Sequence, residues 1–318
     1  MSSVPVEFLA LGLDGVKFYE KRHNEFHGPC CFCGGKDRFR IHTDRPFPHW
    51  NWECRKCGRK GWADQLNPRL KTELTPEMKA EYARKNQESE VARKMAQARL
   101  LDRYRKSRVW EKYHTAMKDK HRAWWRSQGI PDEWQDFWQL GWTPFALHKT
   151  INGVAYTIPK FEFGGVPVNC DYRIIDPPPL FGKYRPIRGL PVAPFISLPN
   201  CDMEKIGSDL YIVEGSKKAM VLTCQKMLPN DSGDYPMVIG IPSCNSWAGI
   251  EKDIDVKSSW DNVWIMLDPG AEEWAHKLAT AIGECASVVT LPEKPDDMVL
   301  AGATRNDFMA YMRRAEKK

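Results

Sequence analysis

Short apolar runs alternate with helical segments over the last third of the chain. The strand-like runs are LYIVEG, MVIGIPS, VWIMLD and SVVTLPE, and the helical segments include SKKAMVLTCQKM, AEEWAHKLATAIG and RNDFMAYMRRAEK. Strands that alternate with helices form parallel sheets covered on both faces. The pattern therefore predicts an α/β domain over 208–318.

The pattern differs just before this domain. Two strand-like runs, VAYTIPKFEF and VPVNCDYRI, are joined through Gly164 and Gly165, which is typical of a hairpin. The Pro-rich stretch DPPPLFGKYRPIRGLPVAP follows, and we expect it to be irregular. We therefore treat 149–207 as a segment of its own.

A helical segment is predicted over 73–148. Thr75-Pro76-Glu77 is a helix start, and no Gly or further Pro follows until about 127. Pro131-Asp132-Glu133 opens another short helix that ends at Gly141. One or two amphipathic helices are indicated by apolar residues at helical spacing: Val91, Met95, Ala98, Leu101 and Tyr104.

Charge is distributed unevenly along the 318 residues. The formal net charge is +6, but Arg84–Arg126 holds 14 Lys and Arg against 5 Asp and Glu, and the rest of the chain is at −3. Such a block suggests a polyanionic partner, although a charge run is also the ordinary surface of a solvated helix. We find no signal peptide and no apolar run long enough to span a bilayer, so a cytoplasmic protein that does not enter membranes is expected.

Five of the ten cysteines lie between positions 30 and 57, in residues 1–72. Two C-x-x-C pairs separated by 20 residues match a tetrahedral structural Zn²⁺ site with Cys30, Cys33, Cys54 and Cys57 as ligands. Cys31 has the wrong spacing to replace a ligand. A redox dithiol and an iron–sulfur cluster are the competing interpretations.

Between the two pairs lie cations and aromatic residues. Lys36, Arg38 and Arg40 are candidate phosphate contacts, with plain solvation as the alternative. The aromatic residues between the pairs favour core packing over base stacking; they are Phe39, Trp50 and Trp52.

Carboxylates follow three of the predicted strands. Glu214 ends LYIVEG, Asp268 ends VWIMLD, and Asp296 and Asp297 follow SVVTLPE. Ligands of open α/β sheets gather at the carboxyl ends of strands, and clustered carboxylates suit Mg²⁺ or Mn²⁺. The alternative is that each acid caps the helix after it.

The N-terminal motifs resemble those of a known family. The string GPCCFCGGKDRFRI…WNWECRKCGRKGWADQL resembles the zinc-binding domain of DnaG-like and phage-type DNA primases over about 27–66, with Cys31 where the family usually has Pro. In that family the domain helps to read the template where priming starts.

The acidic motifs resemble the TOPRIM domain of the same primases over about 208–300. The resemblance implies that Glu214, Asp268 and Asp296 are catalytic acids that hold Mg²⁺ or Mn²⁺, with Asp297 as a substitute. Two positions depart from the family pattern, because Lys218 and Gly270 stand where acids are usual. The implied fold class is an α+β and α/β multidomain protein: a zinc ribbon with a small β-sheet, a helical linker and a Rossmann-like TOPRIM core.

The resemblance also implies contacts to nucleotide and template. CDYRIID…FGKYRPIRG resembles the basic segment of the primase polymerase core, and the helix after Glu214 begins with two lysines near its N-terminus, where phosphate is favoured. The candidates are Arg173, Lys183, Arg185, Arg188, Lys217 and Lys218.

The implied function is a DNA primase, a nucleotidyltransferase that makes short RNA primers on single-stranded DNA from NTPs during replication. The implied partner is a separate replicative helicase, and the implied setting is the cytoplasm of a bacterium or phage-infected cell. Two alternatives stay open: a catalytically degenerate nucleic-acid-binding protein that kept the TOPRIM fold and zinc ribbon, and a TOPRIM nuclease.

Overall fold

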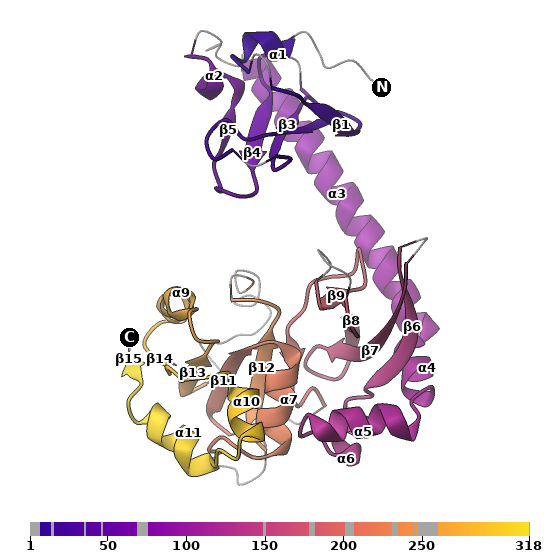
Figure 1. Cartoon of the computed structure of the whole chain (residues 1–318), viewed down its shortest axis with the longest axis vertical. Coiled ribbons are helices and arrows are strands. Elements are labelled where there is room, and N and C mark those ends of the chain that lie inside the picture. The colour runs from indigo at the N-terminus through magenta and orange to yellow at the C-terminus, as the bar shows by residue number, and fades with distance from the viewer. Residues whose placement is uncertain are drawn as a thin grey trace. The chain divides into compact units, whose positions relative to one another are not determined.

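The chain divides into two compact units in a computed structural model, Met1–Glu90 and Val91–Lys318 (Figure 1). The boundary falls within helix α3 (Pro76–Ser107). None of the helices in the described residues is both long and apolar enough to cross a membrane. The structure describes residues 7–13, 16–34, 36–45, 47–68, 76–148, 151–177, 182–200, 207–230, 235–244, 246 and 260–317. Thr75, where we expected the helical segment to begin, lies outside them.

The N-terminal unit is built on a five-stranded antiparallel sheet with its strands in chain order. Burial alternates along β3 and β4, as expected for strands with one buried face. Phe39 pairs with Cys54 and Ile41 with Trp52 across these two strands. The elements are α1 (Glu7–Ala10), β1 (Tyr19–Arg22), β2 (Glu25–Gly28), β3 (Phe39–His42), β4 (Asn51–Cys54), β5 (Lys60–Trp62) and α2 (Ala63–Leu66).

Aromatic side chains fill the small core of this unit. Phe39 is fully buried and stacks on Trp52 with ring centroids 5.3 Å apart. The indole N–H groups of Trp50 and Trp52 donate to the carbonyls of Arg45 and Trp62, both at 2.8 Å. The predicted core role of Phe39, Trp50 and Trp52 is therefore confirmed, and the buried indoles keep their polar atoms bonded.

The helical segment contains α3, α4 (Val109–Thr115), α5 (Asp119–Ser127) and α6 (Asp132–Phe137). The predicted apolar stripe of α3 packs only toward its C-terminal end. Tyr104 is buried and donates its hydroxyl to the carbonyl of Asn169 at 2.9 Å, and Leu101 packs beside it. Val91 and Met95 are exposed, so regular spacing alone overstated the buried face.

A four-stranded antiparallel sheet follows, with β6 (Gly141–His148), β7 (Ile151–Phe161), β8 (Pro167–Ile174) and β9 (Tyr184–Pro186) in chain order. The predicted hairpin across Gly164 and Gly165 is confirmed as β7–β8. Strand β6 was not predicted, because its residues GWTPFALH include a proline and show no clean alternation. Strand β9 forms inside the Pro-rich stretch that we expected to be irregular, and it pairs with β8.

The last part of the chain is a six-stranded sheet in the order β10-β12-β11-β13-β14-β15. Its four central strands are parallel: β12 (Met237–Ile241), β11 (Asp209–Glu214), β13 (Asn262–Met266) and β14 (Ala286–Val288). The short strands β10 (Phe195–Ile196) and β15 (Glu316–Lys317) pair antiparallel at the edges. The described helices after β11 are α7 (Ser216–Cys224), α9 (Glu272–Ile282), α10 (Pro295–Leu300) and α11 (Arg305–Met312).

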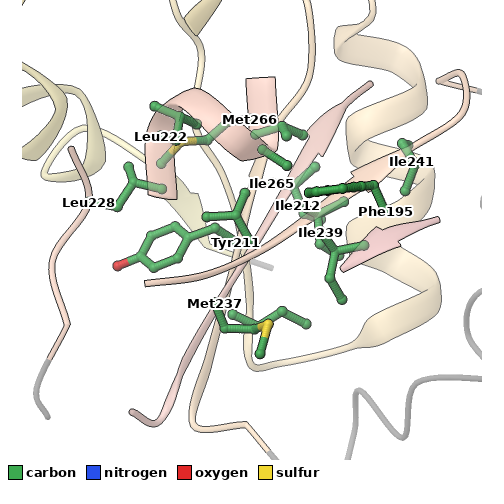
Figure 2. Packing of buried hydrophobic residues seen from close by; sticks show 14 of the residues in the cluster. Phe195, Tyr211, Ile212, Leu222, Leu228, Met237, Ile239, Ile241, Ile265 and Met266 are labelled. Carbon is green, nitrogen blue, oxygen red and sulfur yellow. The ribbon is translucent and has the colours of Figure 1, made fainter. Parts of the chain in front are cut away.

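The core of this sheet explains its apolar runs. Every residue of β12 is buried, as are the four central residues of β11, so these strands are covered on both faces. Figure 2 shows Ile212 and Ile239 from two adjacent strands close to Phe195 of β10, and Ile265 of β13 farther along the same core. Burial of each such side chain stabilises the fold by about 1.5–3 kcal/mol. The predicted fold class, with a small cysteine-bearing sheet, a helical segment and an α/β core, is confirmed.

Candidate functional site

The four predicted cysteine ligands come together in the N-terminal unit. The sulfur atoms of Cys30, Cys33, Cys54 and Cys57 all lie within 4.8 Å of one another. Within the described part of the chain, this is the one group of three or more Cys, His, Asp or Glu side chains close enough to share a metal ion. Cys31 is exposed and outside the group, as its spacing predicted.

Each C-x-x-C pair forms a tight turn. The N–H of Gly34 donates to the Cys30 carbonyl and the N–H of Gly58 to the Cys54 carbonyl, both at 2.9 Å. Gly34 and Gly58 have φ of 68° and 70°, a conformation that glycine adopts without strain. The chain therefore folds back at both pairs and presents two sulfurs from each.

The surroundings of the sulfurs suit a metal that binds thiolate. Although burial of Cys54 opposes ionisation, the backbone N–H groups of Cys57 and Lys56 lower the pKa of its thiol to about 6, whereas burial raises the pKa of the neighbouring Cys30 thiol to about 12. Zinc binds deprotonated sulfur, and four thiolates at this spacing form a closed structural site. The residues present therefore fit Zn²⁺.

The predicted phosphate contacts of this unit differ in their surroundings. Lys36 and Arg38 are exposed. Arg40 is half-buried and forms ion pairs with Glu53 at 3.1 Å and Glu25 at 3.8 Å. Its charge is already balanced within the small sheet.

A cavity of about 400 Å³ lies in the C-terminal unit, between residues of the four-stranded and six-stranded sheets. Its wall mixes acids with lysines, and it includes several of the residues predicted from the sequence. The charged residues that line it are Lys160, Asp171, Lys183, Glu214, Lys217, Lys218, Lys294, Asp296 and Asp297. We call this cavity the acid–lysine pocket.

Glu214 reaches the pocket because β11 ends in a sharp turn. Gly215 has φ of 92°, and its N–H donates to the carbonyl of Ile241 at 2.7 Å. Gly240 of β12 lies directly against this turn, since a Cβ built there would meet the Gly215 oxygen at 2.6 Å. Two glycines thus bring the neighbouring strand close and orient the end of β11.

Electrostatics set Glu214 apart from an ordinary surface acid. Burial raises the pKa of its carboxyl, and the nearby negative charge of Asp268 raises it further. Lys218 and Lys294 act in the opposite direction. A carboxylate held at such a raised pKa gains from any cation that approaches it.

Two lysines of α7 form ion pairs with the other predicted acids. The Lys218 ammonium lies 2.9 Å and 3.1 Å from the two carboxylate oxygens of Asp268, and it donates to the carbonyl of Glu214 at 2.9 Å. The Lys217 ammonium lies 2.7 Å from Asp296 and donates to Gln128 at 3.1 Å. The lysines predicted to meet phosphate are thus held by the predicted metal ligands.

The acids do not all lie at strand ends as expected. Asp268 comes two residues after β13, close to the predicted position. Asp296 and Asp297 lie in the first turn of α10, well beyond the end of β14, because the chain makes a further bend at SVVTLPEKP. Asp296 is nevertheless buried, and one of its carboxylate oxygens has no hydrogen-bond partner among the described residues.

The acids that follow Gly270 have partners near the start of α9. Gly270 donates its N–H to the Glu272 carboxylate at 2.9 Å, and Glu273 pairs with Lys277 on α9. Both acids therefore serve the first turns of that helix.

Of the basic candidates in and near the four-stranded sheet, some line the acid–lysine pocket and others do not. Lys183 lines the pocket, and its pKa is lowered by burial and by the charges of Arg173, Lys217 and Lys294. Arg173 of β8 lies over the ring of Trp124 at 4.1 Å. Arg185 is half-buried in β9 and Arg188 is exposed; neither lines the pocket.

Sequence reasoning missed three charged residues of the pocket. Lys160 and Asp171 are buried and form an ion pair at 2.8 Å, with Lys160 also donating to the carbonyl of Ala193 at 2.7 Å. Lys294 precedes α10. The available signal for Lys160 and Asp171 was a charged residue inside each of the two predicted strand-like runs.

About half of the cations of the basic helical block form ion pairs with nearby acids. Arg126 pairs with Asp119 and Asp132 at 2.8 Å each, and Arg122 pairs with Asp136 at 2.7 Å. Further ion pairs in the block involve Arg84, Lys85, Arg105, Lys106 and Arg108. The local excess of positive charge is therefore less available to a partner than its count suggests.

These features define a protein with a four-cysteine ribbon, a helical segment and an α/β core that carries an acid–lysine pocket. No family model and no curated protein matches the chain. Among solved structures, it is similar to one described as the crystal structure of the Aquifex aeolicus primase, zinc-binding and RNA polymerase domains. That match has 14% sequence identity and a TM-score of 0.47, and it covers 98% of this chain and 84% of the other.

Proposed function

We propose that the protein is a DNA primase that synthesises short RNA primers on single-stranded DNA from NTPs, with a divalent metal ion. The observation that carries the proposal is the acid–lysine pocket, where Glu214, Asp296 and Asp297 lie with five lysines in one cavity. Acids that suit Mg²⁺ beside cations that suit a triphosphate are what nucleotidyl transfer requires. The four-cysteine ribbon in the same chain also supports the proposal, because we assign to it the reading of the template.

The acids of the pocket offer the oxygen ligands that a divalent ion prefers, although as placed they do not form a ready-made metal group among the described residues. Glu214 has a raised pKa because of burial and Asp268, and Asp296 keeps a buried oxygen without a hydrogen-bond partner in the described residues. Glu214, Asp296 and Asp297 would hold Mg²⁺ or Mn²⁺, and Asp268 is the further acid of the set. A bound ion of this kind aligns phosphates and offsets charge on an attacking oxygen.

The remaining residues of the pocket would bind and orient the nucleotide. Lys183 and Lys294 face the cavity and lower the cost of bringing in a triphosphate. Lys217 can exchange Asp296 for a phosphate oxygen, since among the described residues its ammonium contacts only the Asp296 carboxylate and the Gln128 amide oxygen. We assign the template to Arg173 and Arg185 of the four-stranded sheet, and start-site selection to the ribbon.

Partners and setting follow from the same proposal. Single-stranded DNA and NTPs would be the substrates, and a separate replicative helicase would deliver the template. The cytoplasm of a bacterium or phage-infected cell is the compartment in which such a protein would work.

A second candidate function is a nucleic-acid-binding protein that has lost catalysis. The ion pairs Lys218–Asp268 and Lys217–Asp296 favour it, because both place a lysine on an acid that the metal would use. The two candidates differ in whether nucleotide is incorporated.

The test is primer synthesis on mixed-sequence single-stranded DNA with labelled NTPs and either Mg²⁺ or Mn²⁺. Wild type, Glu214→Gln and Glu273→Gln are compared, the last being an exposed acid of α9 and thus a matched control. Short labelled RNA from wild type and Glu273→Gln, but not from Glu214→Gln, is the expected result. DNA binding without product in both metals would support the non-catalytic candidate, and cut DNA without nucleotides would support a nuclease.

A further inference from the structure

The ammonium of Lys218 has the surroundings of a bound cation. Three oxygen atoms lie within 3.1 Å of it: both carboxylate oxygens of Asp268 and the main-chain carbonyl of Glu214. Its side chain is 13% exposed and that of Asp268 is 20% exposed. The positive charge is therefore largely removed from water and held by oxygen ligands from two strand ends.

The position of Lys218 is not explained by its own helix. Lys217 and Lys218 lie in the first turn of α7, where the helix dipole favours anions and disfavours cations. Their placement thus depends on the acids opposite them. Lys218 pairs with Asp268 after β13, and Lys217 pairs with Asp296 in α10.

The two acids nearest Lys218 repel each other. The charge of Asp268 raises the pKa of Glu214, and the charge of Lys218 lowers it. In a partly buried site, two neighbouring carboxylates stay ionised only with a cation beside them, since otherwise one of them takes up a proton. A covalently attached ammonium supplies that charge without any metal.

We infer that Lys218 is a built-in cation that takes the place of a divalent ion beside Glu214 and Asp268. The acid–lysine pocket then takes one divalent ion, on the Glu214 and Asp296 side. This inference rests on the proposed function only in its use of a divalent ion, and it concerns metal stoichiometry rather than catalysis.

The Lys218 ammonium is expected to weaken the binding of a divalent ion beside Asp268. A divalent ion placed next to Asp268 would lie within a few ångströms of the Lys218 ammonium and be repelled by it. At an effective dielectric constant of about 20, one such contact is strong enough to change affinity by well over tenfold. Removal of the ammonium therefore opens a second site, and an added carboxylate strengthens it.

The experiment is Mn²⁺ titration of the zinc-loaded full-length chain without nucleotide, followed by electron paramagnetic resonance of free Mn²⁺ and by calorimetry. Wild type is compared with Lys218→Met, which keeps the length of the side chain, and with Lys218→Asp. Lys277→Met removes an exposed, ion-paired lysine on α9 and is the matched control. Lys218→Arg keeps the positive charge, and circular dichroism checks the fold of every variant.

The expected result is one Mn²⁺ per chain for wild type, Lys277→Met and Lys218→Arg, and two for Lys218→Asp. Lys218→Met is expected to bind an ion beside Asp268, with a dissociation constant for that ion lower than in wild type by about tenfold or more. Two ions of similar affinity in wild type, or no change in a folded Lys218→Met or Lys218→Asp, would overturn the inference. If primer synthesis fails while the Lys218 variants still change Mn²⁺ binding, the proposed function falls and this inference stands.

Discussion

The buried ion pair of Lys160 and Asp171 allows a quantitative test of how the acid–lysine pocket is held together. The two side chains are 3% and 11% exposed, and their charged atoms are 2.8 Å apart. At that distance and an effective dielectric constant of about 20, Coulomb's law gives an attraction of roughly 6 kcal/mol. The desolvation of both charges offsets most of this gain, so the pair adds little net stability as a whole.

Removal of one partner leaves the other charge buried without a counterion, whereas removal of both leaves no unpaired charge. Lys160→Met leaves the Asp171 carboxylate buried without its cation, and Asp171→Asn leaves the Lys160 ammonium without its anion. Each single variant is expected to lower the free energy of unfolding by about 3–5 kcal/mol. The double variant holds neither charge, so its loss is expected to be smaller than the sum of the two by about 2 kcal/mol or more.

The assay is urea unfolding of wild type, the two single variants and the double variant, followed by tryptophan fluorescence. Because the chain has two compact units, the transition of Val91–Lys318 is identified as the one that a zinc chelator leaves unchanged. Additive single losses, or single losses below about 1 kcal/mol, would show that the two charges are solvated and independent, which would refute the reasoning.

The remaining predictions concern the turn after β11, the ribbon and a buried histidine. Gly240→Ala is expected to lower the free energy of unfolding, measured by urea titration, by about 1–3 kcal/mol, because the added Cβ meets main-chain atoms at 2.6 Å and 2.8 Å. Gly182→Ala is the control and should be neutral, because the nearest atom to its added Cβ is 3.7 Å away. Cys54→Ser is expected to abolish stoichiometric zinc binding, measured by a colorimetric release assay, while Cys31→Ser retains one zinc per chain; equal zinc content would contradict the ligand assignment. Burial lowers the pKa of His121 below its ordinary 6.5. As the pH falls, His121 is therefore protonated in the unfolded chain before it is protonated in the folded chain. The free energy of unfolding then decreases as the pH falls from 6.5 through the folded pKa. His121→Gln should lack that part of the loss in melts below pH 6.5, and an unchanged pH slope would contradict it.

Much of the fold follows from local patterns in the sequence. The two C-x-x-C pairs define the ribbon ligands because knuckle turns are short and each is closed by a glycine, Gly34 or Gly58. The strands β11, β12 and β13 are predictable because a strand covered on both faces is a continuous apolar run. The β7–β8 hairpin is predictable from Gly164 and Gly165 in its turn.

The rest depends on contacts between distant parts of the chain. The edge strands β10 and β15 have two residues each, too short for any periodicity, and they exist only because β12 and β14 offer free edges. Lys217 and Lys218 are adjacent in sequence but pair with acids in different elements. Since successive helical residues point about 100° apart, the sequence shows that two lysines follow Glu214 but not which acid each one meets.

Strand β10 has a practical consequence for dissecting the protein. It precedes the α/β segment in the chain, yet it covers the edge of β12, whose five residues are all buried. A fragment that starts at residue 208 would lose this strand and present an unpaired apolar edge to its neighbours, which is a template for aggregation. A fragment that keeps Phe195–Ile196 should stay monodisperse, so limited truncation around this strand reports whether the α/β core is an independent folding unit.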